Sequence, residues 1–209
     1  MARPANQSRE ESLRKALDLF WSKGFHNTSL KDLEQALNMR PGSIYAAFTS
    51  KEALFCEALN DYGRAAKADY VQVMDAHASS VDGLIAYVRD MATQHDRDLP
   101  ARACMAVKTV LEMPADQGAM REGAETLLKG FEQAFTQAFA KAIAAGEVDD
   151  DKSPERLARK FQADVTGMRV LSEHRSGGGN INERVEDIVD WLEGLKVKAG
   201  VPARTASSH

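Results

Sequence analysis

Apolar residues recur every three or four positions along most of the chain, which is the spacing of one buried face of an α-helix. Stretches of this kind alternate with short polar segments that contain Pro, Gly or N-capping residues. We expect nine helices, at about residues 8–23, 29–37, 41–48, 51–77, 80–97, 101–112, 116–145, 154–174 and 181–198. No segment has the alternation of a convincing β-strand, so the predicted fold class is all-α with about nine helices.

Capping signals mark several helix ends. Ser8 with Glu11 has the spacing of a capping box for the first helix, and Gly24 is a typical C-terminal stop. Ser29 with Asp32 has a similar arrangement at the second helix, and Pro41 suits the first position of the third, where a missing N–H costs nothing. These signals predict two short helices joined by a tight turn between residues 28 and 54.

Two short helices joined in this way, with small and polar residues and one aromatic residue on the second, are typical of a DNA-binding helix-turn-helix. The segment resembles the N-terminal domain of the TetR family of transcriptional regulators. The resemblance covers roughly residues 9–59 and rests on residues in one register: Gly24-Phe25, Thr28, Gly42-Ser43-Ile44-Tyr45, Phe48 and Lys51. For the rest of the chain it is one of length and helix content. It implies a DNA-binding domain at 1–56, an effector-binding and dimerisation domain at 57–200, and a disordered tail at 201–209.

Six residues are expected to contact DNA: Thr28, Arg40, Gly42, Ser43, Tyr45 and Lys51. The resemblance implies that Thr28, Tyr45 and Lys51 touch phosphates or sugars and that Gly42 lets the backbone approach the duplex. Arg40 and Ser43 are candidates for base edges, because arginine pairs well with guanine O6 and N7. Pro41 stands where many family members have lysine, and alanines replace a common polar pair before Phe48. Base readout is therefore expected to depend on Arg40, on Ser43 and on the alanine methyl groups.

The implied function is that of a ligand-responsive regulator, most often a repressor, which a small molecule releases from a palindromic double-stranded operator. The resemblance also implies a homodimer. The expected effector-binding residues are Tyr87, Met91, Cys104, Phe131, Phe135 and Arg169. Apolar stripes on the last two helices suit a four-helix interface between subunits, or else lie wholly inside one chain. The expected interface residues are Phe161, Val165, Met168, Val185, Ile188, Val189 and Leu192.

Cys104 raises a separate hypothesis. Its surroundings resemble the Gly-Cys-Leu-x-Val segment of a subset of TetR-like regulators, some of which sense electrophiles or oxidants through the cysteine. Arg102, Lys108 and an expected helix start near Ala101 would favour the reactive thiolate, whereas Glu173 would oppose it. A small cysteine also packs well without any chemistry, and this alternative stays open.

Composition and charge reduce the number of functional classes to which the protein could belong. The chain has a net charge of −4, yet residues 1–60 contain eight Lys and Arg against seven Asp and Glu, a net charge of +1. DNA affinity is therefore expected from a few placed contacts.

No apolar run or leader predicts a membrane span or secretion, so a cytoplasmic protein is expected. The five histidines and two cysteines show no metal-site spacing, and no cofactor is predicted. Scattered acids such as Glu112 are expected to be solvated. An all-α enzyme and a helical protein-interaction module remain the alternatives, although no convergent set of catalytic groups is found.

Overall fold

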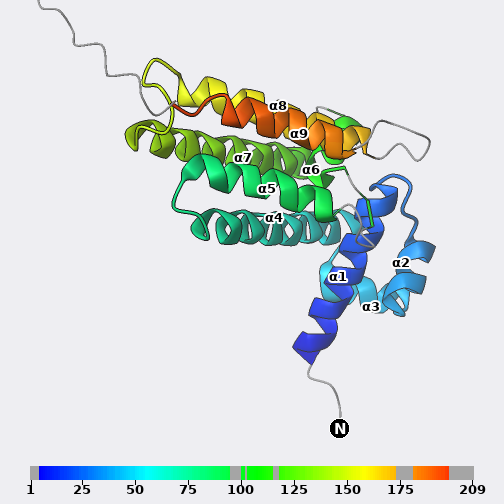
Figure 1. Ribbon diagram of the computed structural model, residues 1–209. Helices are drawn as coiled ribbons and strands as arrows, with labels where there is room; N and C mark the ends of the chain where they lie inside the picture. The colour runs from blue at the N-terminus through cyan, green and yellow to red at the C-terminus, as the bar shows by residue number, and fades with distance from the viewer. Residues whose placement is uncertain (1–4, 95–99, 102, 115–117, 173–180, 198–209) are drawn as a thin grey trace, which may run out of the picture.

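The computed structural model describes residues 5–94, 100, 101, 103–114, 118–172 and 181–197. In this part of the chain every named element is an α-helix, and the one β-type pairing is an isolated bridge between Val148 and Lys196. The helices are α1 (Ala5–Lys23), α2 (Leu30–Leu37), α3 (Pro41–Phe48), α4 (Lys51–Asp75), α5 (Ser80–Gln94), α6 (Met105–Glu112), α7 (Gly118–Ala144), α8 (Pro154–Leu171) and α9 (Ile181–Glu193) (Figure 1). The predicted fold class is confirmed. None of these helices is long and apolar enough to cross a membrane.

Most of the predicted helix starts are confirmed, and two are wrong. The Ser29 hydroxyl accepts a hydrogen bond from Asp32 N at 3.1 Å, and the Asp32 carboxylate accepts one from Ser29 N at 2.8 Å, so the capping box is complete. The first helix begins at Ala5, which places Ser8 inside it. The sixth begins at Met105 rather than near Ala101. Cys104 is therefore the N-cap residue of α6.

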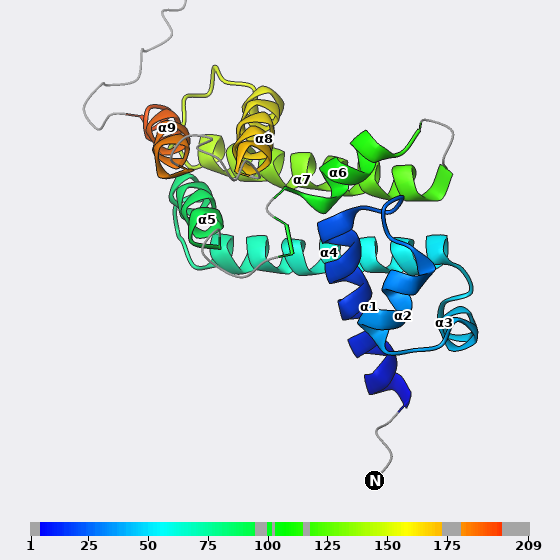
Figure 2. The same ribbon diagram turned by 90° about the vertical axis from the view of Figure 1, so that its right-hand side faces the viewer.

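Two clusters of buried side chains hold the helices together, and α4 and α7 contribute to both. The first cluster joins α1, α2, α3 and the first half of α4 to α6 and to the start of α7. The second joins the last part of α4 to α5, α8, α9 and the remainder of α7. Figure 2 shows α4 and α7 running side by side, with α1 to α3 near one end and α5, α8 and α9 near the other. The long helices therefore connect the helix-turn-helix to the larger helical bundle.

The expected intersubunit stripes on α8 and α9 belong to the second cluster. All seven residues are buried inside a single chain: Phe161, Val165, Met168, Val185, Ile188, Val189 and Leu192. Their assignment to the dimer interface is therefore corrected, because the core of one chain already accounts for the apolar stripes. The outward face of α8 instead carries Ala163, Gly167, Val170 and Leu171, the last two being 37% and 36% exposed.

Candidate functional site

The α2–turn–α3 segment displays a small polar face. Asn38 closes α2 in the left-handed backbone conformation, with φ of 53°, and its N–H bonds to the Glu34 carbonyl. This turn lets the chain reverse tightly, because asparagine tolerates that conformation better than most residues. The inward side of α3 buries Ile44 and Phe48. The exposed face then consists of Arg40, Gly42, Ser43, Tyr45 and Ala46.

Four of the six predicted DNA-contacting residues share this exposed face. Arg40 is the N-cap residue of α3 and uses no side-chain bond for capping, so its guanidinium is not committed to the helix end. A side chain at Gly42 would meet no atom within 4 Å, so packing within the chain does not require glycine there. The Tyr45 ring is 42% exposed. The predicted contact roles of these residues stay predictions.

Thr28 does not lie on this face. Its side chain is fully buried, and its hydroxyl donates a hydrogen bond of 2.6 Å to the carbonyl of Gly24. A hydroxyl that is fully buried and already donates its proton to a backbone carbonyl cannot contact a phosphate. Thr28 therefore fixes the turn between α1 and α2, and its predicted DNA contact is corrected.

Lys51 lies at the first position of α4, and its ammonium stands 4.2 Å from the centre of the Phe25 ring. Burial lowers the pKa of Lys51 below its ordinary value, although nearby carboxylates partly offset this effect. The side chain is half-buried rather than free in solvent. Contact with a phosphate would require the ammonium to share the space over Phe25 or to move away from it.

α3 is also held from behind by α1. The Arg9 guanidinium lies 4.7 Å from the centre of the Phe48 ring and donates two hydrogen bonds, of 2.9 and 2.7 Å, to the Glu57 carboxylate on α4. One side chain thus joins α1, α3 and α4. Both bonds come from one guanidinium nitrogen, Nη2, and with the contact to Phe48 they hold the Arg9 side chain between α3 and α4.

Three polar side chains fasten α6 to the corner between α1 and α2, an arrangement that we call the corner contact. The Trp21 indole N–H donates to the Ala103 carbonyl at 2.8 Å, just before α6. The Lys108 ammonium donates to the Trp21 and Ser22 carbonyls at 2.6 and 3.2 Å. The helix α6 is therefore attached both at its start and along its length.

The Glu112 carboxylate completes the corner contact at the end of α6. It accepts hydrogen bonds from the backbone N–H groups of Phe25, at 3.0 Å, and His26, at 2.6 Å. Gly24 has a φ of +82°, and a Cβ there would stand 2.6 Å from a Glu112 oxygen. The positive φ favours glycine at this position, and a Cβ there would force the Glu112 carboxylate to move. The expectation that Glu112 is merely solvated is wrong.

Three predicted effector residues come together where α4, α5, α6 and α8 meet. The buried Tyr62 side chain on α4 interacts with Cys104 and Arg169, and Tyr87 interacts electrostatically with both. Burial, followed by the neighbouring Cys104, raises the pKa of Tyr62, so this phenol stays protonated at neutral pH. Burial raises the pKa of Tyr87 to about 12. Tyr62 is not among the predicted effector residues.

The other three predicted effector residues lie elsewhere. Phe135 is buried at the centre of an aromatic cluster, with its ring centre 4.9 Å from that of Phe161 and 5.5 Å from that of Tyr70. Phe131 stacks on it at 6.2 Å, and Met91 packs at the edge of the second core. Tyr87 joins the two groups, because its ring centre lies 6.2 Å from that of Phe135. The shared effector role of the six residues stays a prediction.

The charged residues expected near Cys104 are Arg102, Lys108 and Glu173. Arg102 and Glu173 lie outside the described residues. The Lys108 ammonium is bonded to the α1 carbonyls. The expectation that Lys108 activates the thiol is therefore not supported by its hydrogen bonds. Cys56 lies on α4, and burial raises the pKa of its thiol, which disfavours the thiolate.

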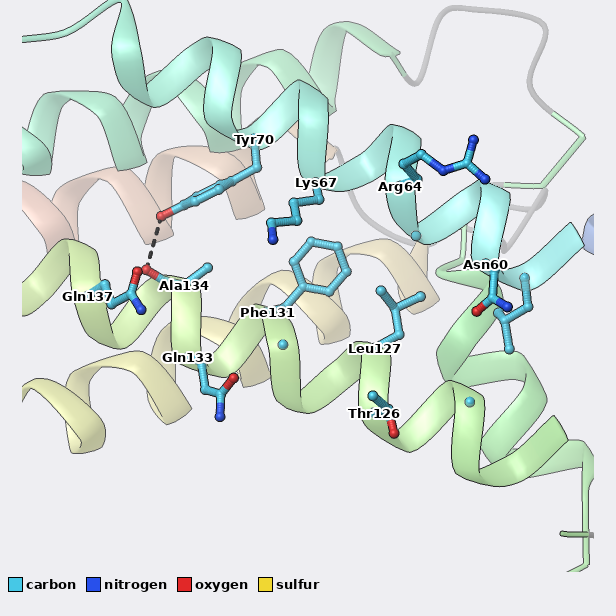
Figure 3. Close-up of a pocket in the computed structure, with 14 residues that line it drawn as sticks. Asn60, Arg64, Lys67, Tyr70, Thr126, Leu127, Phe131, Gln133, Ala134 and Gln137 are labelled. Atoms are coloured by element: carbon cyan, nitrogen blue, oxygen red, sulfur yellow. Dashed lines mark hydrogen bonds between the residues drawn. The ribbon is translucent and has the colours of Figure 1, made fainter. Parts of the chain in front are cut away.

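A cavity of about 410 Å³ opens between α4 and α7, and we call it the α4–α7 groove. Phe131 is the one predicted effector residue that lines it (Figure 3). The sequence reasoning missed the groove because its lining mixes apolar, amide and basic residues. The available signal was glycine on two long helices, at positions 63, 123 and 130.

Known proteins share this arrangement of helix-turn-helix and helical bundle. Residues 13–58 match the family described as bacterial regulatory proteins, tetR family, and residues 80–175 match the tetracyclin repressor-like C-terminal domain. The HTH-type transcriptional repressor ComR of Escherichia coli K12 is 28% identical over 170 residues, which is 80% of each chain.

Solved structures of TetR family regulators also resemble this chain. The TetR family transcriptional regulator CifR, in a cysteine-substituted form complexed with 26-bp double-strand operator DNA, is 28% identical. Its TM-score is 0.78, and the match covers 90% of this chain and 96% of CifR. A TetR family regulator from Cytophaga hutchinsonii is similar in fold, with a TM-score of 0.81, 23% identity, and coverage of 95% and 99%.

Proposed function

Because the chain belongs to the TetR family of bacterial regulatory proteins, we propose that it is a transcriptional repressor that a small molecule releases from its operator. The observation that carries this proposal is the short helix α3. Ile44 and Phe48 anchor one side of it, and Arg40, Ser43 and Tyr45 stand on the other. ComR is a named repressor, and CifR is seen with operator DNA. The protein acts on DNA in the cytoplasm and has a regulatory rather than catalytic role.

Within the operator, Arg40 and Ser43 contact base edges in the major groove, while Tyr45 and Lys51 contact the backbone. Phosphate contacts fix the position of the protein on the duplex, and base contacts carry sequence information. Gly42 has no side chain, which allows the backbone of α3 to approach the DNA closely at that position. Loss of Arg40 is therefore the change that most directly reduces sequence discrimination.

A second copy of the chain covers the outward face of α8 and α9. Ala163 and Gly167 allow close approach of another helix, and Val170 and Leu171 supply exposed apolar surface. Arg184 on α9 has a buried Nε atom without a hydrogen-bond partner in the described part of the chain. A partner subunit would supply one, and buried donors are rarely left unpaired. A two-fold dimer then presents two copies of α3 to successive major grooves, about 34–36 Å apart.

The effector binds among the helices of the bundle, and both α4 and α6 connect that region to the helix-turn-helix. α4 does so by its length, and α6 does so through the corner contact. A tenfold loss of operator affinity needs only about 1.4 kcal/mol of differential binding. A small displacement of either helix is therefore enough for release.

Selection of operator sequences from random double-stranded DNA, followed by gel-shift titration, tests the proposal. We expect an inverted repeat, bound by a dimer. Arg40→Ala is expected to weaken binding to the selected repeat by about 1–3 kcal/mol and to relax the preference at one base pair of each half-site. Equal retention of all sequences by the wild-type protein would contradict the proposal and favour a helical protein-interaction module.

A further inference from the structure

The α4–α7 groove is the feature that the proposed function leaves unassigned. Residues of α4 and α7 line it (Figure 3). At one end the Tyr70 hydroxyl donates a hydrogen bond of 3.3 Å to the Ala134 carbonyl, which ties α4 to α7. A volume of about 410 Å³ is within the range of pockets that hold small organic molecules.

The floor of the groove is apolar and continuous with the core. Leu59, Leu127, Phe131 and Tyr70 supply its apolar surface. The Tyr70 ring packs edge-on against Phe135, at 5.5 Å between ring centres, and Phe131 stacks on the same residue. The groove is therefore the outer side of an aromatic cluster, which favours a planar or alkyl group as its occupant.

The rim of the groove is cationic. Arg64 and Lys67 come from α4, and no carboxylate belongs to the lining, although the chain as a whole has a net charge of −4. Arg64 forms an exposed ion pair of 2.9 Å with Asp61, which lies outside the lining. Lys67 has no such partner among the described residues. Gln133 on α7 also belongs to the lining.

Glycines create the space. Added Cβ atoms at Gly130 would meet nothing within 4 Å, so this position opens the groove without being needed for helix packing. At Gly63 the opposite holds, because a Cβ there would stand 2.7 Å from Leu127. The two long helices thus touch at Gly63 and leave room at Gly130. Glycine inside a helix is less favourable than alanine, and at Gly130 no neighbouring atom of the described residues requires it.

We propose that the α4–α7 groove binds an amphipathic organic anion, a single carboxylate or sulfonate on an aromatic or medium-length alkyl body. The body lies on Phe131 and Tyr70, and the anionic group meets Lys67 and Arg64. This inference rests on the proposed function, because such a ligand would be the effector that the bundle recognises. A ligand between the two helices pushes α4 away from α7 beside the Gly63 contact. Since α4 begins at Lys51, that displacement reaches the helix-turn-helix directly.

Direct binding tests the proposal without any DNA. Decanoate and 1-anilinonaphthalene-8-sulfonate are titrated into the full-length protein by calorimetry and fluorescence, with decanol as the uncharged comparison. Gly130→Leu fills the groove while adding a better helix former, and Lys67→Gln with Arg64→Gln removes the rim charge. Lys141→Gln, an exposed lysine on α7 away from the groove, is the matched control.

We expect the wild type and Lys141→Gln to bind both anions equally well and decanol at least tenfold more weakly. Gly130→Leu should lose binding, and the doubly neutral variant should bind about tenfold more weakly. The double variant alters only exposed side chains and is expected to fold. Its affinity therefore still tests the groove if Gly130→Leu does not fold. Unchanged affinity in both groove variants, or equal affinity for decanol and decanoate, would overturn the assignment. Gel-shift titration of the wild-type protein then separates the two proposals, because failure of the wild type to bind either anion together with intact operator binding would refute the groove assignment alone.

Discussion

Removal of the Glu112 carboxylate is the sharpest test of how the bundle holds the helix-turn-helix. In Glu112→Ala the N–H groups of Phe25 and His26 lose acceptors at 3.0 and 2.6 Å. A hydrogen bond to a charged group contributes about 1.5–3 kcal/mol. Because His26 is exposed, water replaces part of that interaction, and we expect a total loss of about 2 kcal/mol. For a chain of this size the melting temperature should fall by about 4–8 °C.

Calorimetry measures the melting temperature, and amide hydrogen exchange measures the local effect. The Phe25 and His26 amides should exchange faster in Glu112→Ala, because their acceptor is gone. Glu122→Ala is the control, since Glu122 is exposed on α7 and surface changes of this kind usually alter stability by less than 0.5 kcal/mol. If Glu112→Ala melts within 1 °C of the wild type and leaves both amides unchanged, the Glu112 part of the corner contact contributes nothing to the folded state.

Three further changes test other parts of the molecule. Lys51→Ala should weaken all DNA sequences about equally and lower the slope of log affinity against log salt by about one; a changed sequence preference at constant slope would rule out a phosphate contact. Val170→Asp with Leu171→Asp should give a folded monomer by light scattering, whereas a dimer would place the interface elsewhere. Operator release by a maleimide should disappear in Cys104→Ser but persist in Cys56→Ser, and release that survives in Cys104→Ser would end the sensor hypothesis.

Local signals predicted local structure well. Ser29 with Asp32 stands at the start of α2 and Pro41 at the start of α3, where the capping signals predicted them. The start of α6 was missed, because Ala101 and Ala103 are buried before the helix begins and so continue its apolar pattern. The periodicity of apolar residues indicates which residues are buried. It does not distinguish a helical turn from an extended segment that is equally buried.

Long-range features could not be predicted in the same way. The stripes on α8 and α9 identify residues such as Phe161 and Leu192 as buried, but a sequence pattern does not state whether the same chain or a second copy covers them. Glu112 bonds to backbone N–H groups 86 and 87 positions away, and every residue except proline carries such a group. Thr28 is similar, since its partner is the carbonyl of Gly24. No side-chain type marks these partners in the sequence.

The sharing of the first core between α1–α4 and α6–α7 has a consequence for protein engineering. A chimera that exchanges residues 1–56 for those of another regulator would place a foreign first helix against Met105 and Ala106, which are buried in that core. It would also present a foreign turn to Glu112 and Lys108. New operator specificity is therefore better transferred through the exposed face of α3 alone, leaving α1 and its turn as they are. The same sharing implies that the helix-turn-helix does not keep its core when it is separated from the bundle, because Met105, Ala106 and Met120 complete that core.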